Sequence, residues 1–230
     1  MDCRFPTESR GRSEEVSEPG TQIRESLDWY RAARDFRALI VEVAIAFTTS
    51  WCLGFSILDD SIRYLGAAEQ VFERPGVQSG NLIDPERMPP AAAIDIGREI
   101  CTAGQKFGYR GLVGLDMCID RDARIFFFDL NFRRAGSTCF ILLHDETDRS
   151  RQVGLQRSVN LRASLADALS KLSDLVRDRR YVPLQLFDGV ADDFEVTPSR
   201  LTGFVRGASR REVEMLDDEI RSRLSKLCIR

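Results

Sequence analysis

Apolar and polar side chains alternate most strictly between Gly108 and Thr138, where two such runs flank a polar turn. This two-residue period predicts an antiparallel β-hairpin with one apolar and one polar face. With the turn at Arg121 to Arg124, Asp116 of the first strand lies opposite Asp129 of the second. The second strand should place Phe126, Phe128, Leu130 and Phe132 on its apolar face, and Phe127, Asp129, Asn131 and Arg133 on its polar face.

The polar face of this hairpin gathers three oxygen-bearing side chains, Asp116, Asp129 and Asn131. Two carboxylates in a direct cross-strand pair repel each other, so the arrangement calls for a compensating charge. Mg²⁺ prefers oxygen ligands and usually takes one or two carboxylates, while substrate phosphates and water complete its shell. The pattern is therefore typical of a magnesium site, although a hairpin whose polar face is only hydrated has the same alternation.

The remaining pattern predicts further strands and helices around the hairpin. Strands are expected at residues 38–47, 51–58, 61–72 and 181–187, with a turn at Asp59-Asp60 joining the second and third. Helices are expected from Pro89-Pro90 to Gly108, over residues 161–176, and after the capping box of Ser209 and Glu212. Their inward stripes would be Ile96, Ile100, Ala103 and Phe107; Leu161, Leu165, Ala168, Leu169, Leu172 and Val176; and Val213, Leu216, Ile220 and Leu224. The fold class is α+β, an antiparallel sheet with packed helices.

Composition narrows the class of protein. Residues 1–22 are polar and rich in Ser, Glu, Arg, Gly and Pro, so we expect them to be disordered and residues 23–230 to fold. The 33 basic and 36 acidic residues nearly balance, which argues against nucleic acid as a partner. The apolar stretch from Leu39 to Phe47 is short and interrupted by Glu42, and no signal core precedes it. We therefore expect a cytoplasmic protein with no membrane span.

The hairpin motif resembles the metal-binding end of the ATP-grasp superfamily, where an acidic residue on one strand precedes Glu-x-Asn-x-Arg on the next. Here the second strand reads Asp129-Leu130-Asn131-Phe132-Arg133, with Asp129 in place of Glu, and Ala135-Gly136-Ser137-Thr138 follows. Upstream, Glu69-Gln70 at the end of a strand followed by a loop with Gly80-Asn81 is a second match. The two motifs together are similar to the amide-forming ligases of the superfamily.

This resemblance implies an ATP-dependent carboxylate–amine ligase that forms an amide through an acyl phosphate. Its cofactors would be ATP and Mg²⁺, with Mn²⁺ as an alternative ion. Asp116, Asp129 and Asn131 would bind the metal, and Arg133 would be the catalytic residue that steadies the acyl phosphate. The partners would be small-molecule carboxylate and amine substrates.

Two further roles follow from the same resemblance. Gly136 and Ser137 would bind substrate by allowing its close approach to the backbone. Val41, Glu42 and Val43 would form the hinge strand that binds the nucleotide, although a strand end with Glu42 in water fits the same residues.

The resemblance covers roughly residues 38–225 and corresponds to the C-terminal half of a full ligase. We therefore expect residues 23–230 to be a partial ATP-grasp domain, formed by the C-terminal lobe and its covering helices. Such a ligase would be incomplete as a single chain, with a complementing chain or a second copy as its partner. The alternative function is that of a degenerate, non-catalytic ATP-grasp remnant that serves as a binding or interaction domain.

Overall fold

The computed structural model describes residues 45–74, 77–145, 152–189 and 198–228. Every described residue belongs to one compact unit, Ile45–Arg230. The predicted disorder of residues 1–22 and the predicted hinge at Val41, Glu42 and Val43 therefore lie outside the described residues.

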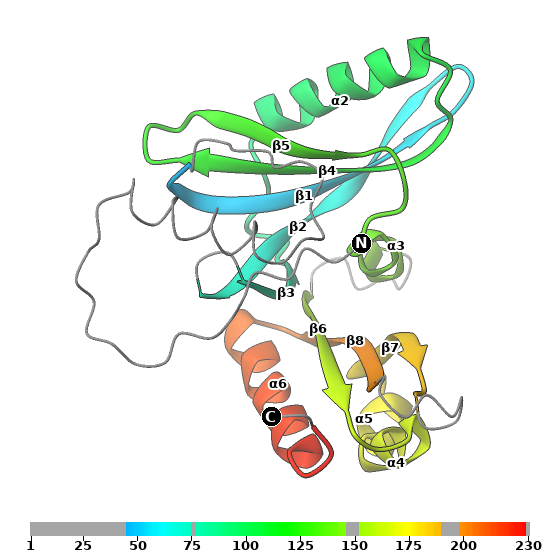
Figure 1. Ribbon diagram of the computed structural model, residues 1–230. Coiled ribbons are helices and arrows are strands. Elements are labelled where there is room, and N and C mark those ends of the chain that lie inside the picture. The colour runs from blue at the N-terminus through cyan, green and yellow to red at the C-terminus, as the bar shows by residue number, and fades with distance from the viewer. Residues whose placement is uncertain (1–44, 75–76, 146–151, 190–197, 229–230) are drawn as a thin grey trace, which may run out of the picture. The chain divides into compact units, whose positions relative to one another are not determined.

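The described strands form one eight-stranded sheet in the order β5-β4-β1-β2-β3-β6-β8-β7 (Figure 1). All neighbouring strands are antiparallel, which confirms the predicted α+β class with an antiparallel sheet. The strands are β1 Phe47–Ile57, β2 Ile62–Arg74, β3 Val77–Ile83, β4 Gly111–Asp120, β5 Ile125–Asn131, β6 Val153–Leu161, β7 Tyr181–Phe187 and β8 Ser199–Gly207.

The β4–β5 hairpin keeps the predicted pairing of Asp116 with Asp129 but not the predicted faces of β5. The register shifts between Asp116 and Met117, which pairs with Phe127, so Phe128 has no partner in the ladder. Because of this bulge, the residues of β5 before Phe128 face the opposite sides of the sheet from those predicted. Phe127, predicted on the polar face, packs against the core, whereas Phe128, predicted on the apolar face, is 53% exposed.

The hairpin predicted around Asp59-Asp60 is confirmed, because β1 and β2 pair on either side of that turn. The loop predicted at Gly80-Asn81 is wrong. β2 continues past Gln70 to Arg74, and Gly80 and Asn81 lie in β3, where Asn81 pairs with Gln70. β3 in turn pairs with β6 over Gly80–Ile83, and this pairing joins β5, β4, β1, β2 and β3 to β6, β8 and β7.

Helices cover both faces of the sheet. They are α2 Ala91–Lys106, α3 Thr138–Asp145, α4 Leu165–Lys171, α5 Ser173–Arg177 and α6 Arg210–Leu224. Buried apolar side chains join α2 to β1 and β4, join α4, α5 and α6 to β6 and β8, and join α3 to β2 and β8. None of the helices among the described residues is long and apolar enough to cross a membrane.

The inward face of α2 differs from the predicted stripe. Its buried residues are Ala93, Gly97 and Cys101, whereas Phe107 is 93% exposed. Small residues are required because a Cβ at Gly97 would lie 2.9 Å from the Phe55 ring. Of the predicted stripe, Ile100 is partly buried against the core, whereas Ile96 is exposed, because small residues occupy the positions of α2 closest to the sheet.

The single helix predicted over residues 161–176 is wrong in two places. Leu161 ends β6, and the helix starts only after Ser164, whose hydroxyl accepts a hydrogen bond from the Asp167 backbone N–H at 3.1 Å. A break at Leu172 then separates α4 from α5. The side chains of Leu165, Ala168 and Leu172 are nevertheless buried as expected.

The last helix matches its prediction. Ser209 accepts a hydrogen bond from the Glu212 backbone N–H, and Glu212 accepts one from the Ala208 backbone N–H at 2.7 Å. This is close to a capping box, which satisfies free donors at a helix start. The predicted stripe of Val213, Leu216, Ile220 and Leu224 is buried.

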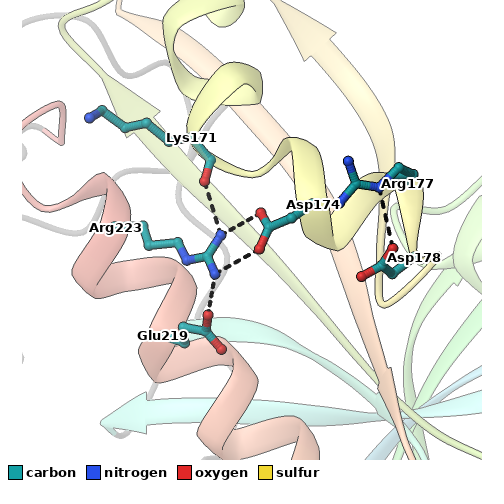
Figure 2. A network of polar contacts seen from close by, with 6 residues as sticks. All are labelled: Lys171, Asp174, Arg177, Asp178, Glu219 and Arg223. Carbon is teal, nitrogen blue, oxygen red and sulfur yellow. Dashed lines mark hydrogen bonds and ion pairs between the residues drawn. The ribbon is translucent and has the colours of Figure 1, made fainter.

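Arg223 ties α6 to α4 and α5 through the network in Figure 2. Its two terminal nitrogens donate to the two Asp174 carboxylate oxygens at 2.6 and 2.9 Å. One of them also donates to the Lys171 carbonyl at 3.1 Å, and the other to Glu219 at 2.5 Å. The hydrogen bonds from Arg223 lower the pKa of Asp174 to about 2.

We expect Arg223→Met to lower the melting temperature by a few degrees at neutral pH, and by less as the pH falls. Because the folded pKa of Asp174 is depressed, its contribution is complete above the ordinary value of 3.8 and is lost as the pH falls toward about 2. Thermal melts of both proteins between pH 7 and pH 2 measure this. Arg177→Met is the control, because Arg177 makes only a 3.5 Å contact with the adjacent Asp178. A deficit independent of pH would contradict the assignment.

Candidate functional site

A cavity of about 590 Å³ opens on the face of the sheet that carries α3. The cross-strand pairs of Asp116 with Asp129 and of Asn81 with Gln156 lie on this face, which is opposite the face that packs against α2 and α6. The volume is in the range of small-molecule sites. The described side chains around it are largely polar or charged: Gln70, Glu73, Gln78, Asn81, Asp116, Asp129, Asn131, Arg133, Ser137, Gln156, Arg157, Ser158, Asn160, Gln185, Arg200, Thr202 and Arg221.

The acidic end of the cavity is formed by Asp116 on β4 and Asp129 on β5, which face each other across the two strands. Asn131 donates a hydrogen bond from Nδ2 to Asp129 Oδ2 at 2.6 Å, which leaves the Asn131 Oδ1 oxygen free to bind a cation. Burial raises the pKa of Asp116, and the nearby negative charge of Asp129 adds to this shift. Two carboxylates held together in this way favour a cation between them.

These donors fit a magnesium ion. Among the described residues, no three His, Cys, Asp or Glu side chains converge on one point. A cation here would therefore be held by two carboxylates and the Asn131 amide oxygen, with water and substrate oxygens as further ligands. That mixture is the usual environment of Mg²⁺, which keeps part of its hydration shell and binds substrate phosphates.

The predicted catalytic and substrate residues line the same cavity. Arg133 follows β5 and has an exposed side chain, held by a 3.1 Å hydrogen bond from Nη1 to the Arg134 carbonyl. Gly136 and Ser137 lead into α3, and a Cβ at Gly136 would meet no atom within 4 Å. The space beside the Gly136 backbone is thus open to a ligand.

Ser137 is buried at the wall of this cavity. Its backbone carbonyl accepts a hydrogen bond from the Ile141 N–H at 2.9 Å, which starts α3. The Ser137 hydroxyl lies beside the Cys52 thiol and has no nitrogen or oxygen partner among the described residues. Burial raises the pKa of the Cys52 thiol, so it stays neutral beside Asp116.

Several cavity residues were not predicted from the sequence. Gln156, Ser158 and Asn160 occupy alternate positions of β6 and so share one face. Gln156 donates to the Gly136 carbonyl at 3.3 Å and accepts from the Asn81 amide at 2.8 Å. Their two-residue spacing was visible in the sequence, but only the pairing of β6 with β3 brings them to the cavity.

Comparison with protein families gives a match over much of this chain. Residues 14–131, just over half of the chain, match the family model described as L-aspartate–L-methionine ligase, ATP grasp. The matched segment ends at Asn131 and thus contains all three residues of the acidic end of the cavity.

Solved structures with a similar fold include carboxyaminoimidazole ribonucleotide synthase from Aspergillus clavatus complexed with ATP, at 14% identity and a TM-score of 0.59. That match covers 90% of this chain and 57% of the other. N5-carboxyaminoimidazole ribonucleotide synthetase from Thermus thermophilus matches at 14% identity and a TM-score of 0.55, covering 89% of this chain and 57% of the other. The chain therefore spans less than two thirds of the length of these proteins, and the likeness concerns the fold.

Proposed function

Because the chain belongs to the ATP-grasp family described as L-aspartate–L-methionine ligase, we propose that it acts in the ATP-dependent joining of an amino-acid carboxylate to an amine. The observation that carries this proposal is the convergence of Asp116, Asp129 and Asn131 on one cavity with Arg133 and Ser137. L-Aspartate and L-methionine, the amino acids in the family description, are the first substrates to test.

The reaction has two steps. A carboxylate oxygen of one substrate attacks the γ-phosphorus of ATP, forming an acyl phosphate and releasing ADP. The amine of the second substrate then attacks the acyl carbon, and phosphate leaves as the amine loses a proton. Both steps move negative charge between oxygens, so the residues around the cavity act mainly by positioning and by charge.

The predicted metal-binding, catalytic and substrate-binding residues have the following roles in this scheme. Asp116, Asp129 and Asn131 would hold Mg²⁺, which when bound neutralises phosphate charge and orients the phosphates. The exposed guanidinium of Arg133 can reach a phosphate oxygen of the acyl phosphate and donate to it in a bidentate manner. Gly136, whose backbone faces open space, would let the substrate approach closely, and Ser137 beside it forms the buried wall of the cavity.

We expect Asp129→Asn to weaken Mg²⁺-dependent ATP binding by at least about 10-fold. The change removes one negative charge but keeps an oxygen that can accept the hydrogen bond from Asn131. Isothermal titration calorimetry of ATP with and without Mg²⁺ measures it. Asp218→Asn is the matched control, because Asp218 is exposed on α6 and does not line the cavity.

Two results would overturn the proposal in different ways. Equal affinity of the wild-type protein and the Asp129→Asn variant for Mg²⁺–ATP would exclude the metal role of the acidic end. If the wild-type protein bound no Mg²⁺–ATP at all, the non-catalytic role in binding or interaction would replace the ligase role.

A further inference from the structure

The Glu69-Gln70 pair of β2 sends its two side chains to opposite faces of the sheet. Glu69 lies on the face that packs against α2 and α6, where Arg210 donates to it at 2.7 Å. Gln70 lies on the cavity face, where it pairs with Asn81 and lines the cavity. Because the Gln70 amide carries no charge, any part that it plays in the cavity must come from its hydrogen bonds.

A row of short side chains separates Gln70 from Asp116. The strand between them is β1, which pairs with β2 on one side and with β4 on the other. On the cavity face β1 carries Ser50 and Cys52, and Cys52 pairs both with Asp116 and with Ala68. Since these side chains are short, the longer Gln70 side chain can cross β1 toward the Asp116 carboxylate.

Ser50 determines which end of the Gln70 amide faces Asp116. The Ser50 hydroxyl is buried and donates to Gln70 Oε1 at 2.5 Å, and the Met117 carbonyl is a second acceptor at 3.2 Å. Because Gln70 Oε1 accepts this hydrogen bond, the Nε2 group is the end left for Asp116. The reverse orientation would place an amide oxygen against a carboxylate, and two acceptors repel each other.

The Asp116 carboxylate accepts hydrogen bonds from groups of the protein itself. Burial raises the pKa of Asp116, and hydrogen bonds from the Cys52 thiol and the Gln70 amide oppose that shift. Donors of this kind stabilise a charged carboxylate. Asp129 has a similar partner, because Asn131 Nδ2 donates to its Oδ2 atom at 2.6 Å. Each carboxylate of the acidic end thus has an amide donor that fixes its orientation.

We propose that Gln70, oriented by Ser50, is a positioning residue whose amide holds the Asp116 carboxylate in the orientation that binds Mg²⁺. This rests on the proposed ligase function, since the metal would serve the phosphates of ATP. Neither Ser50 nor Gln70 needs to touch the ion. A hydrogen-bonded partner behind a metal ligand fixes the geometry of that ligand, and its loss weakens metal binding by about 10- to 100-fold.

The test is Mn²⁺ binding to the 230-residue chain, measured by electron paramagnetic resonance without and with ATP. Gln70→Met keeps the length of the side chain and removes its amide, and we expect it to weaken Mn²⁺ binding by about 10-fold or more. Ser50→Ala leaves the amide without its anchor, and we expect a loss of about 3- to 5-fold. Adding Ser50→Ala to Gln70→Met should cause no further loss, because Ser50 acts only through Gln70.

Gln105→Met is the matched control, because Gln105 lies on α2 outside the cavity and donates to the Leu58 carbonyl at 2.8 Å. It removes the same amide and should leave Mn²⁺ binding unchanged. A loss in Gln70→Met no larger than in this control would overturn the proposal, and so would losses in Ser50→Ala and Gln70→Met that add, as independent packing defects do. If Gln70→Met failed to fold, Ser50→Ala would decide, and full Mn²⁺ affinity there would overturn the proposal.

The outcomes also separate this role of Gln70 from the ligase function. Mn²⁺ binding that depends on Gln70, in a protein with no affinity for ATP, would refute the ligase function alone. Mg²⁺–ATP binding that depends on Asp129, with no effect of Gln70→Met, would refute the role of Gln70 alone. A chain that bound no Mn²⁺ either with or without ATP would overturn both.

Discussion

Arg210→Met is expected to lower the free energy of unfolding by about 2–4 kcal/mol at neutral pH. Arg210 opens α6, and its Nε and Nη2 atoms lie 2.5 Å from Asp84 Oδ2 and 2.7 Å from Glu69 Oε2. Asp84 is buried, and Glu69 precedes the cavity residue Gln70. Removing the guanidinium would leave a buried carboxylate without its closest positive charge, which costs more than an exposed ion pair contributes. Urea unfolding followed by circular dichroism measures the change.

The pH dependence of this loss follows from Asp84. Burial alone would raise the pKa of Asp84, but the hydrogen bonds and charge of Arg210 outweigh burial and lower it. The stabilisation by Asp84 is therefore present above the unfolded value of about 4 and is lost as the pH falls through the depressed folded value. In Arg210→Met the downward shift of the Asp84 pKa should be smaller, because only the Glu86 backbone N–H and the Arg87 charge then oppose burial. The difference between the two proteins should be full at pH 7 and shrink toward pH 3.

Arg211→Met is the control for this change, because Arg211 is the next residue of the same helix and is exposed. It should alter the free energy of unfolding by no more than about 0.5 kcal/mol. A loss in Arg210→Met that is no larger than in this control, or that grows toward low pH, would show that Arg210 does not compensate the buried carboxylate.

What the sequence predicted well depends on short-range rules. The start of α6 followed from Ser209 and Glu212, since a cap uses groups within one helical turn. The pairing of Asp116 with Asp129 was also correct, but the predicted turn does not explain it. Next to the turn Ile119 pairs with Ile125, one residue away from the predicted register, and the bulge at Phe128 offsets this difference before Asp116.

What the sequence did not predict depends on distant contacts. The bulge at Phe128 has no sequence signal, and it moved Phe127 to the core. Gly80-Asn81 was assigned to a loop because of the resemblance to the ATP-grasp ligases and because a Gly-Asn pair is typical of turns, but Gly80 lies in β3 where that strand meets β6. The contribution of β6 and β8 to the cavity was equally hidden, because only the order of the eight strands brings these two strands beside β3. Asp116, Asp129 and Asn131 lie in one hairpin, whereas Gln156, Ser158 and Thr202 reach the cavity from β6 and β8.

Gly80→Ala should lower the free energy of unfolding by about 3 kcal/mol, the upper end of what overpacking costs. A Cβ at this position would lie 2.2 Å from the Gln156 carbonyl oxygen. That oxygen belongs to the backbone of β6, so it cannot turn away as a flexible side chain would. The strands β3 and β6 would have to separate, although they pair over only Gly80–Ile83. Urea unfolding of the variant and the wild-type protein measures the loss.

The same separation should affect ligand binding, which makes the seam between β3 and β6 testable in a second way. The Asn81–Gln156 hydrogen bond crosses this seam, and both side chains line the cavity. Gly80→Ala should therefore also weaken Mg²⁺–ATP binding, under conditions where the variant is still folded. Gly54→Ala is the matched control, because this strand glycine has its nearest atoms at 3.5 Å, an ordinary contact for a Cβ. If both alanine variants unfolded at the same urea concentration as the wild-type protein, β3 and β6 could not be packed as closely as the structure places them. The two halves of the cavity would then not depend on Gly80 for their connection.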